Sequence, residues 1–393
     1  MSARRTWAMW AAALGIAALY VGSTILTPLY PVYERELGFT ELVVTEIYAI
    51  YVVGNLAVLF FFGRLSDGIG RRVTTLIALA ITVASAVCFL LARGTAWLFA
   101  ARVLNGFAAG LGAGALTAWI AELEPAGDRA RAATYASGGN LLGLAFGALG
   151  AGLLAQHAPS PLRLCFACYA VLLVIVGALL AFVPETVERR VRSVRDLSLR
   201  PRIGIPSGIR VPFIAPAAMA FAAFALGGFF AALAPGLLTR RLGETDLSIV
   251  GAIVALFFGV ASATAAATQR LDSRKALFSA SALVLVGLAL LLVADGARSM
   301  PVLIAAAVAT GAAMALGYRS SLEIVNAIAP GERRAEVVSS YLLVCYSANA
   351  IPVIGVGLLA LVVSPENAHR VFAAVLAALA LLACAIAARH LKR

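Results

Sequence analysis

The sequence predicts an all-α membrane protein in which 12 transmembrane helices form two bundles of six. Three observations support this fold class. The chain of 393 residues is 62% hydrophobic and 13% charged, with a mean hydropathy of +0.96, which is far from the balance of a soluble globular protein. It contains 12 apolar stretches long enough to cross a bilayer. Its pattern also repeats at a constant offset of 205 residues.

Each apolar stretch holds about 20 mostly apolar residues, the length that an α-helix needs to span the hydrocarbon core. We expect the helices at residues 7–27, 43–62, 73–92, 95–120, 133–156, 163–183, 212–234, 247–268, 276–294, 301–325, 337–362 and 370–388. The first stretch runs into Thr27-Pro28 and then acidic residues, without a small-residue cleavage site. We therefore expect a retained helix and not a removed signal peptide.

The basic residues predict how the helices are oriented. If the helices alternate in direction, 22 of the 31 Lys and Arg residues fall on one side, 7 fall on the other, and Arg102 and Arg319 lie within helices. Basic residues accumulate on the cytoplasmic side of membrane proteins. We expect a multi-pass protein of a bacterial inner (plasma) membrane with both termini in the cytoplasm. The lipid bilayer then accounts for the net charge of +12, and no nucleic-acid partner is needed.

The offset of 205 residues relates the two halves of the chain. It maps Arg35-x-Leu37-Gly38-x-Thr40 onto Arg240-x-Leu242-Gly243-x-Thr245, Asp67 onto Asp272, and Pro125 onto Pro330. A constant offset means six helices duplicated in the same orientation, one of the repeat plans of secondary transporters. We expect bundles at residues 1–183 and 212–393, related by a pseudo-two-fold axis. Residues 184–211 form a cytoplasmic linker, either lying on the anionic inner leaflet or acting as a solvated tether.

A charged loop follows the second helix. Residues 63–72 read Gly-Arg-Leu-Ser-Asp-Gly-Ile-Gly-Arg-Arg, too much charge to lie in hydrocarbon, so we expect a short, tight loop at a membrane face. The loop is similar to G-x-L-a-D-r-x-G-r-r, with Gly68 where a basic residue is usual. With 12 helices in parallel halves, the chain resembles the major facilitator superfamily, and is closest in character to its branch of drug and proton antiporters. Pro184-Glu185-Thr186, closing the sixth helix, is also similar to the family.

The resemblance implies a gating role for this loop, which clamps the two halves together in the superfamily. The implied gating residues are Gly63, Asp67, Gly70, Arg71, Arg72, Glu122 and Asp272. Arg71 or Arg72 would reach Glu122 at the end of the fourth helix, and Asp272 belongs to a degraded second copy of the loop. The alternative is that these arginines only anchor the helix ends.

Two arginines are expected within helices, where each costs at least ~2.5 kcal/mol on insertion scales. Leu98-x-x-x-Arg102-x-x-Asn105-Gly106 is similar to a stretch of proton-coupled members of the superfamily. Arg102 either acts in transport or bonds to carbonyls and polar groups of the first two helices. Arg319 and Glu323 are four residues apart and can pair on one helix face. That pair is either a proton-coupled switch or a structural pair near the inner surface.

The acid that would carry a coupled proton is not obvious. The first helix has no acidic residue between Trp7 and Tyr33, although drug exporters often carry one there. Either coupling uses Glu323, together with Arg102, or Glu46, or this protein is not a typical proton antiporter. Glu46 is also explained as an ordinary acid near a helix amino terminus.

Three glycines of the fifth helix, Gly139, Gly143 and Gly147, are spaced by four and share one face, where two backbones can approach closely. Exporters of the superfamily carry G-x-x-x-G-P-x-x-G-G here, an element associated with antiport. This chain has Leu144 for the proline and Ala148 for the last glycine. The face therefore serves either for packing or as a hinge.

Polar and aromatic residues expected within the membrane are candidates for binding the solute. They are Tyr20, Asn55, Arg102, Asn105, Trp119, Asn140, Phe224, Tyr318, Arg319, Tyr346 and Asn349. A mixed aromatic and amide lining suits amphiphilic or aromatic organic solutes, which gain from stacking and a few hydrogen bonds. Each of these side chains is also compatible with ordinary packing.

Metal and enzyme chemistry are not expected. Cys165 and Cys168 form a C-x-x-C without a histidine nearby, and His157, His369 and His390 are placed in loops or at the carboxyl end. Neither a metal centre nor a histidine proton relay within the membrane is then supported. No nucleotide-binding G-x-x-x-x-G-K-[ST] loop is present, so ATP-driven pumping is not expected. We also expect no cofactor.

These features together predict a monomeric secondary active transporter that is not an enzyme. We expect it to move a small organic solute by alternating access, with proton-coupled efflux of amphiphilic or drug-like compounds as the first hypothesis. The alternative is a transporter of one metabolite, such as a sugar or an organic acid.

Overall fold

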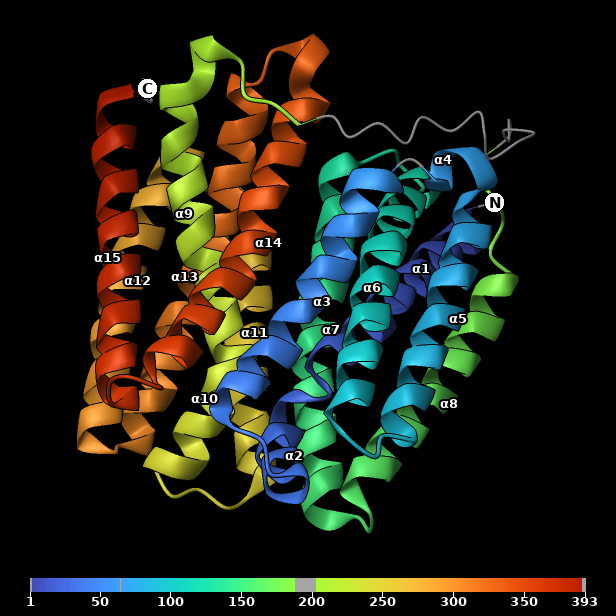
Figure 1. Ribbon diagram of the computed structural model, residues 1–393. Coiled ribbons are helices and arrows are strands. Elements are labelled where there is room, and N and C mark those ends of the chain that lie inside the picture. The colour runs from blue at the N-terminus through green and yellow to red at the C-terminus, as the bar shows by residue number, and fades with distance from the viewer. Residues whose placement is uncertain (1, 64, 188–202, 391–393) are drawn as a thin grey trace. The chain divides into compact units, whose positions relative to one another are not determined.

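The computed structural model describes residues 2–63, 65–187 and 203–390, and in these residues every regular element is a helix (Figure 1). Twelve helical segments are long and apolar enough to cross a membrane, which confirms the predicted fold class. Unbroken helices form ten of them: α3 (Glu41–Phe61), α5 (Arg71–Leu90), α6 (Thr95–Leu123), α7 (Arg129–His157), α8 (Pro161–Ala181), α11 (Leu247–Ala267), α12 (Ser273–Ala297), α13 (Met300–Ile328), α14 (Arg334–Leu359) and α15 (Pro365–His390). Most of the predicted linker at 184–211 lies outside the described residues.

The first and seventh segments are longer than predicted and are interrupted. The first joins α1 (Ser2–Thr24), a 3₁₀ turn at Thr27–Leu29 and α2 (Tyr30–Leu37). The seventh joins α9 (Arg210–Gly228), a π-helical stretch η4 (Phe229–Leu233), α10 (Ala234–Gly236) and a second π-helical stretch η5 (Leu237–Arg241). Proline lacks the donor that an α-helix needs, and Pro28 and Pro235 lie at these interruptions.

This corrects the placement of three arginines. Arg35, Arg240 and Arg241 were expected in loops, but they lie in the last turns of α2 and η5. The sequence reading ended these helices too early because it took the prolines and nearby charges as stops.

The internal repeat is visible in the backbone. Helices α6 and α13 both have 29 residues, and they begin and end 205 residues apart. Helices α7 and α14 also begin 205 residues apart, at Arg129 and Arg334. Gly38 and Gly243, which share that offset, both have positive φ, of 68° and 75°, a conformation that glycine adopts without strain.

The described structure packs as two compact units. Unit 1 comprises Met1–Leu29 and Ile50–Pro201, and unit 2 comprises Tyr30–Ala49 and Arg202–Arg393. Helix α3 contributes its first part to unit 2 and the remainder to unit 1. The division into sequence halves at 1–183 and 212–393 stays a prediction, and residues 30–49 form a segment of the first half that packs within unit 2.

In unit 1, helix α1 packs against α6, α7 and α8. Three glycines of α7 meet the α1 backbone: a Cβ on Gly139 would meet Ala13 O, one on Gly143 would overlap Ala17 O, and one on Gly147 would overlap Val21 O. The predicted close approach of two backbones at this face is therefore confirmed. The hinge alternative for the same glycines stays a prediction.

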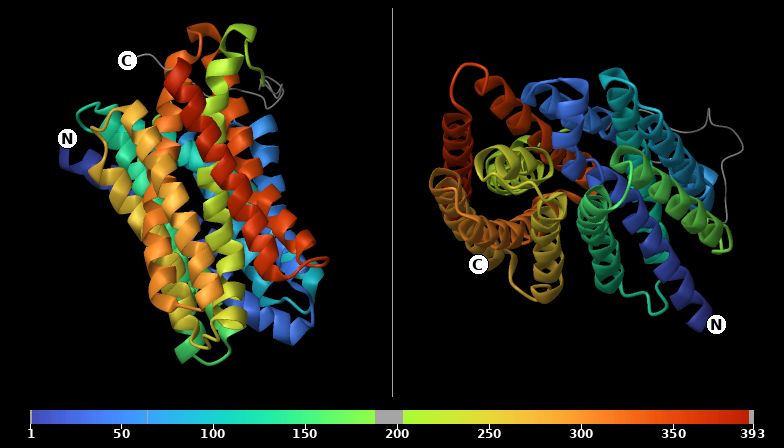
Figure 2. Two further views of the ribbon diagram at one scale, coloured as in Figure 1. Left: turned by 90° about the vertical axis from the view of Figure 1, so that its left-hand side faces the viewer. Right: turned by 90° about the horizontal axis from the view of Figure 1, so that it is seen from below.

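In unit 2, helix α9 occupies the central position. It packs against α12, α13, α14 and α15, and the end-on view in Figure 2 shows α9 enclosed by these helices. Below it, Phe230 stacks on Phe257 with ring centroids 4.3 Å apart. In the most apolar part of the span that contains α9, 83% of the residues are buried, the largest share among the 12 spans.

Gly143→Val is expected to lower the stability of the protein by about 1–3 kcal/mol, the usual cost of forcing atoms into a packed interior. The new side chain would displace the α1 backbone at Ala17. Gly138→Val on the same helix is the matched control, because nothing lies within 4 Å of a Cβ there. Thermal unfolding of the detergent-purified variants measures both, and equal melting temperatures would contradict this packing.

Candidate functional site

Gly63–Arg72 connects α3 to α5 through a short helix, and Arg64 lies outside the described residues. We expected a short, tight loop; the connection is short, but Leu65–Ile69 within it forms the five-residue helix α4. Gly70 follows it with φ of 108°, so the backbone there favours glycine. This turn positions Arg71 at the start of α5.

Arg71 is the centre of an ion-pair network. Its guanidinium contacts Asp67 at 2.5 Å (Nη1 to Oδ1) and Glu122 at 2.9 Å (Nη2 to Oε1). The predicted contact between this loop and Glu122 is therefore confirmed for Arg71. Arg72 instead donates to the carbonyl of Ala181, at 3.3 Å. A gating role for these residues stays a proposal.

Glu185 completes the network, and sequence reasoning did not assign it a role. Its two carboxylate oxygens accept hydrogen bonds from the backbone N–H groups of Arg71, at 2.9 Å, and Arg72, at 3.2 Å. Helix α5 has no cap from its own N-cap residue, Gly70, so Glu185 satisfies its first turn from outside the helix. The family-like string Pro184-Glu185-Thr186 was the only sequence signal for this residue.

Trp119 belongs to the same end of unit 1. It is fully buried, and its indole Nε1 donates to the carbonyl of Pro184 at 3.0 Å. Two residues after Pro184, the hydroxyl of Thr186 donates to Glu122. The placement of Trp119 is that of a residue holding the chain after α8, so we do not retain it as a solute-binding candidate.

A second polar cluster is buried deep in unit 1, around Arg102 on α6. Arg102 is 1% exposed, and its Nη1 donates to the carbonyl of Ser23 at 3.1 Å. The guanidinium lies over the ring of Tyr51, 5.0 Å from the centroid, and the hydroxyl of Ser23 bonds to Tyr51 Oη at 3.2 Å. The expected bonding of Arg102 to the first two helices is thus present, through α1 and α3.

Two predicted amides lie in or beside this cluster. Asn55 and Asn105 are both 2% exposed, and Asn55 Nδ2 and Asn105 Oδ1 have no hydrogen-bond partner. An unpaired polar atom in an apolar interior is costly, so each is a position where a ligand or a rearrangement can supply a partner. Tyr169 on α8, which sequence reasoning missed, bonds to Ala18 O at 3.0 Å.

The remaining predicted residues of unit 1 are less buried. Tyr20 and Asn140 are both half-buried, on α1 and α7. Glu46, one of the proposed proton carriers, is exposed on the second turn of α3.

Unit 2 brings together three aromatic rings from α9, α13 and α14. Phe224 meets Tyr318 edge to face, with centroids 5.3 Å apart, and Tyr318 stacks with Tyr341 at 6.4 Å. The hydroxyl of Tyr341 donates to the carbonyl of Tyr318 at 3.3 Å. Tyr346 and Asn349 lie further along α14 and are half-buried.

Arg319 and Glu323 form the predicted pair, with Nε and Oε1 3.4 Å apart. Both side chains also bind residues where α12 begins: Arg319 donates to Leu271 O, before the helix, and Glu323 accepts from the hydroxyl of Ser273, its first residue. Asp272 caps α12 in the same turn by accepting from the N–H groups of Arg274 and Lys275. The Glu323 side chain is 44% exposed, which favours the structural alternative near a helix end.

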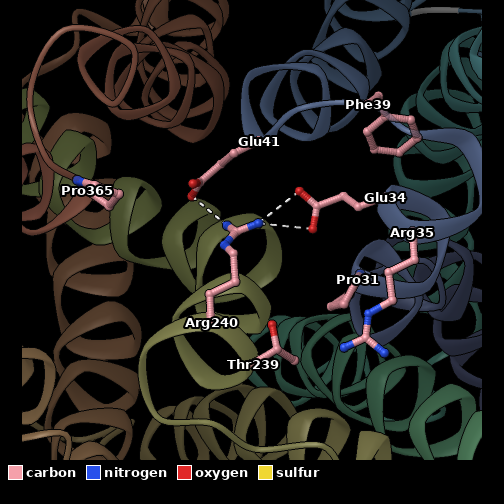
Figure 3. A pocket seen from close by; sticks show the side chains of 8 residues that line it. All are labelled: Pro31, Glu34, Arg35, Phe39, Glu41, Thr239, Arg240 and Pro365. Atoms are coloured by element: carbon pink, nitrogen blue, oxygen red, sulfur yellow. Dashed lines mark hydrogen bonds and ion pairs between the residues drawn. The ribbon is translucent and has the colours of Figure 1, made fainter.

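At the opposite ends of the unit 2 helices, a cavity of about 490 Å³ opens around Arg240 (Figure 3). Arg240 binds Glu34 through Nη1 and Glu41 through Nη2, each at 2.9 Å. The remaining lining residues are Pro31, Arg35, Phe39, Thr239 and Pro365. The two acids flank the turn between α2 and α3, so Arg240 fastens residues 30–49 to η5. We call these three residues the Arg240 latch.

The sequence placement of His369 was wrong. It lies on α15, is 4% exposed, and its Nδ1 is 2.8 Å from Oδ2 of Asp295. Helix α15 begins at Pro365, five residues before the predicted start, because its polar first turns carry no hydrophobic signal. His157 and His390 lie in the last turns of α7 and α15. No group of metal-ligating side chains was found among the residues that the structure describes.

Comparison with known proteins identifies the family. The sequence profile of the Major Facilitator Superfamily matches residues 12–238, which is more than half of the chain. The chain therefore belongs to the Major Facilitator Superfamily, a family of membrane transporters that move small solutes.

Individual relatives match over shorter stretches. The quinolone resistance protein NorA of Staphylococcus aureus is 26% identical over 122 residues, which is 31% of this chain and 31% of NorA. The MFS-type transporter Rv1250 of Mycobacterium tuberculosis is 33% identical over 153 residues, which is 37% of this chain and 26% of that protein. The matched part thus spans less than a third of either relative.

Glu185→Ala is expected to destabilise the protein by about 1–3 kcal/mol, because two backbone N–H groups of α5 would lose a charged acceptor. Glu332→Ala, at an exposed acid of the turn before α14, is the matched control. Thermal unfolding measures the difference between the two. An equal effect of both substitutions would show that Glu185 does not cap α5.

Proposed function

We propose that this protein is a secondary active transporter that exports amphiphilic organic compounds in exchange for protons, by alternating access. The observation that carries the proposal is membership of the superfamily, which makes the chain a transporter. Efflux is supported by the local similarity to NorA, whose name describes quinolone resistance. The solute, the coupling ion and the direction are parts of the proposal.

The proposed orientation follows the distribution of charge. The helix ends near Arg71 in unit 1, and those near Arg274, Lys275 and Arg333 in unit 2, would face the cytoplasm, since basic residues are retained there. Both termini would then be cytoplasmic in a bacterial inner membrane. In unit 2 the opposite end, with the Arg240 latch, would face the outside.

The proposed solute contacts come from each unit separately. In unit 1 they are Arg102, Asn55 and Asn105, because two of these residues hold buried atoms that lack a partner. In unit 2 they are Phe224 and Tyr318, whose rings are only partly buried. Aromatic faces and a few amide groups suit an amphiphile better than a strongly charged solute.

The Arg240 latch supplies a step for alternating access. Residues 30–49 belong to the first half by sequence and pack within unit 2. For this segment to move with the remainder of its own half, Arg240 must release Glu34 and Glu41. Ion pairs near a protein surface are individually weak, so two of them can be broken within a transport cycle.

Transport of a single metabolite is the second candidate. A buried guanidinium such as Arg102 can bind one carboxylate of an organic acid, and this is the observation that favours it. The two candidates differ in which compounds are moved, so a panel of solutes separates them.

The test uses purified protein in liposomes that contain a pH-sensitive dye and carry an imposed proton gradient. An amphiphilic substrate is expected to dissipate the gradient, whereas a response to sugars or organic acids alone would support the metabolite alternative. Arg102→Met should slow the response about tenfold, a loss of about 1.4 kcal/mol of transition-state stabilisation. Val103→Met, at an exposed neighbour on α6, is the control.

Size-exclusion chromatography checks that each variant remains folded. If no compound of the panel dissipates the proton gradient, proton-coupled transport is contradicted. Full activity of folded Arg102→Met would show that Arg102 has only a structural role.

A further inference from the structure

The most deeply buried acid–base pair among the described residues is Asp295 with His369, which lie on α12 and α15. They are 2% and 4% exposed. Oδ2 of Asp295 lies 2.8 Å from Nδ1 of His369, and Oδ1 accepts from Nε of Arg241 at 2.8 Å. One carboxylate therefore holds a guanidinium with one oxygen and an imidazole with the other.

The charged surroundings of His369 are few. Its own helix contributes Glu366, which accepts from Arg241 at 3.1 Å and also pairs with Arg370. Helix α12 contributes Asp295, and η5 contributes Arg241. The seventh span otherwise contributes the ring of Phe229, 5.6 Å from the imidazole, and α14 carries no charged residue between Asn349 and Leu359.

A proton on His369 would change the balance of this group. With a neutral imidazole, Asp295 has one cationic partner, Arg241. With an imidazolium, two cations share one buried carboxylate and repel each other in a medium that screens charge poorly. Asp295 then binds the imidazolium more strongly, and its hold on Arg241 weakens.

Arg241 is the residue next to Arg240. Both belong to η5, a π-helical turn whose geometry is less regular than that of an α-helix. Asp295 and Glu366 hold Arg241 on one side of this turn, and Glu34 and Glu41 hold Arg240 on another. A turn anchored through Arg241 presents Arg240 to its two acids in one orientation, so loosening Arg241 also loosens the Arg240 latch.

We propose that Asp295 and His369 form a proton-binding site that opens the Arg240 latch when the surrounding medium becomes acidic, by weakening the hold on Arg241. The inference deepens the proposed transport function, on which it rests for the identity of the driving ion. The proposed proton carrier is then this buried acid–base pair. Glu46, which is exposed, and Glu323, which binds the residues where α12 begins, no longer have that role. Arg241 acts beside this pair as a positioning residue.

The test measures access to the cavity, without solute and without a proton gradient. Phe39 lines the cavity and is replaced by cysteine in a protein whose five native cysteines are changed to serine or alanine. A membrane-impermeant maleimide labels Phe39→Cys at a series of pH values, with His369 intact and with His369→Gln. The ratio of the two rates at each pH cancels the titration of the thiol itself.

We expect this ratio to rise about fivefold as the medium is acidified from about pH 8 to about pH 5.5. A ratio that stays constant across this range would overturn the proposal. His157→Gln, an exposed histidine at the end of α7, is the matched control and should leave the pH dependence intact.

Asp295→Asn gives a second and independent result. Arg241 would lose its buried anion, so labelling of Phe39→Cys should become fast. The ratio of its rate to the rate with His369→Gln at the same pH, which cancels the titration of the thiol, should then be independent of pH. If His369→Gln fails to fold, this variant alone decides, and a retained pH dependence would overturn the proposal. Because labelling requires no transport, a negative transport assay would not change the labelling result. A negative labelling result would likewise not change the outcome of the transport assay.

Discussion

The structure depends on the absence of water from the hydrocarbon core, where a polar group must form its hydrogen bonds within the protein. In this chain the backbone N–H and C=O groups form them within the helices. Charged side chains satisfy it by gathering at helix ends, as Arg71 does with Asp67 and Glu122, or by bonding to carbonyls, as Arg102 does with Ser23. The few charges of the chain are therefore concentrated where helices meet turns.

The same constraint explains the packing of each unit. Lipid tails are as apolar as the side chains, so helices associate through close fit, and the α7 glycines let the α1 backbone approach. Helices α6 and α13 share the 205-residue register that the sequence repeat predicts. What differs is the polar content: unit 1 buries an arginine, a glutamate (Glu124) and two amides, whereas unit 2 buries an aspartate and a histidine.

Patterns within one helix could be read from the sequence, including the 12 spans, the glycine face and the Arg319–Glu323 pair. Contacts between distant segments could not. The caps that Glu185 gives to α5 join positions more than 110 residues apart. His369 was misplaced because the first turns of α15 are polar and resemble a loop. The burial of His369 depends on its pairing with Asp295, which lies 74 residues away on another helix. The hydrophobic periodicity of α15 alone therefore does not predict a buried histidine.

The central proposal is that residues 30–49 separate from η5 when the Arg240 latch opens. It is tested most directly by the distance between spin labels at Glu36→Cys on α2 and Ala297→Cys at the end of α12, both exposed, in a background without native cysteines. The protein is placed in lipid nanodiscs and measured by pulsed electron resonance. The account predicts two distances, with the longer one gaining population at acidic pH or with solute. A single unchanged distance under every condition would contradict it.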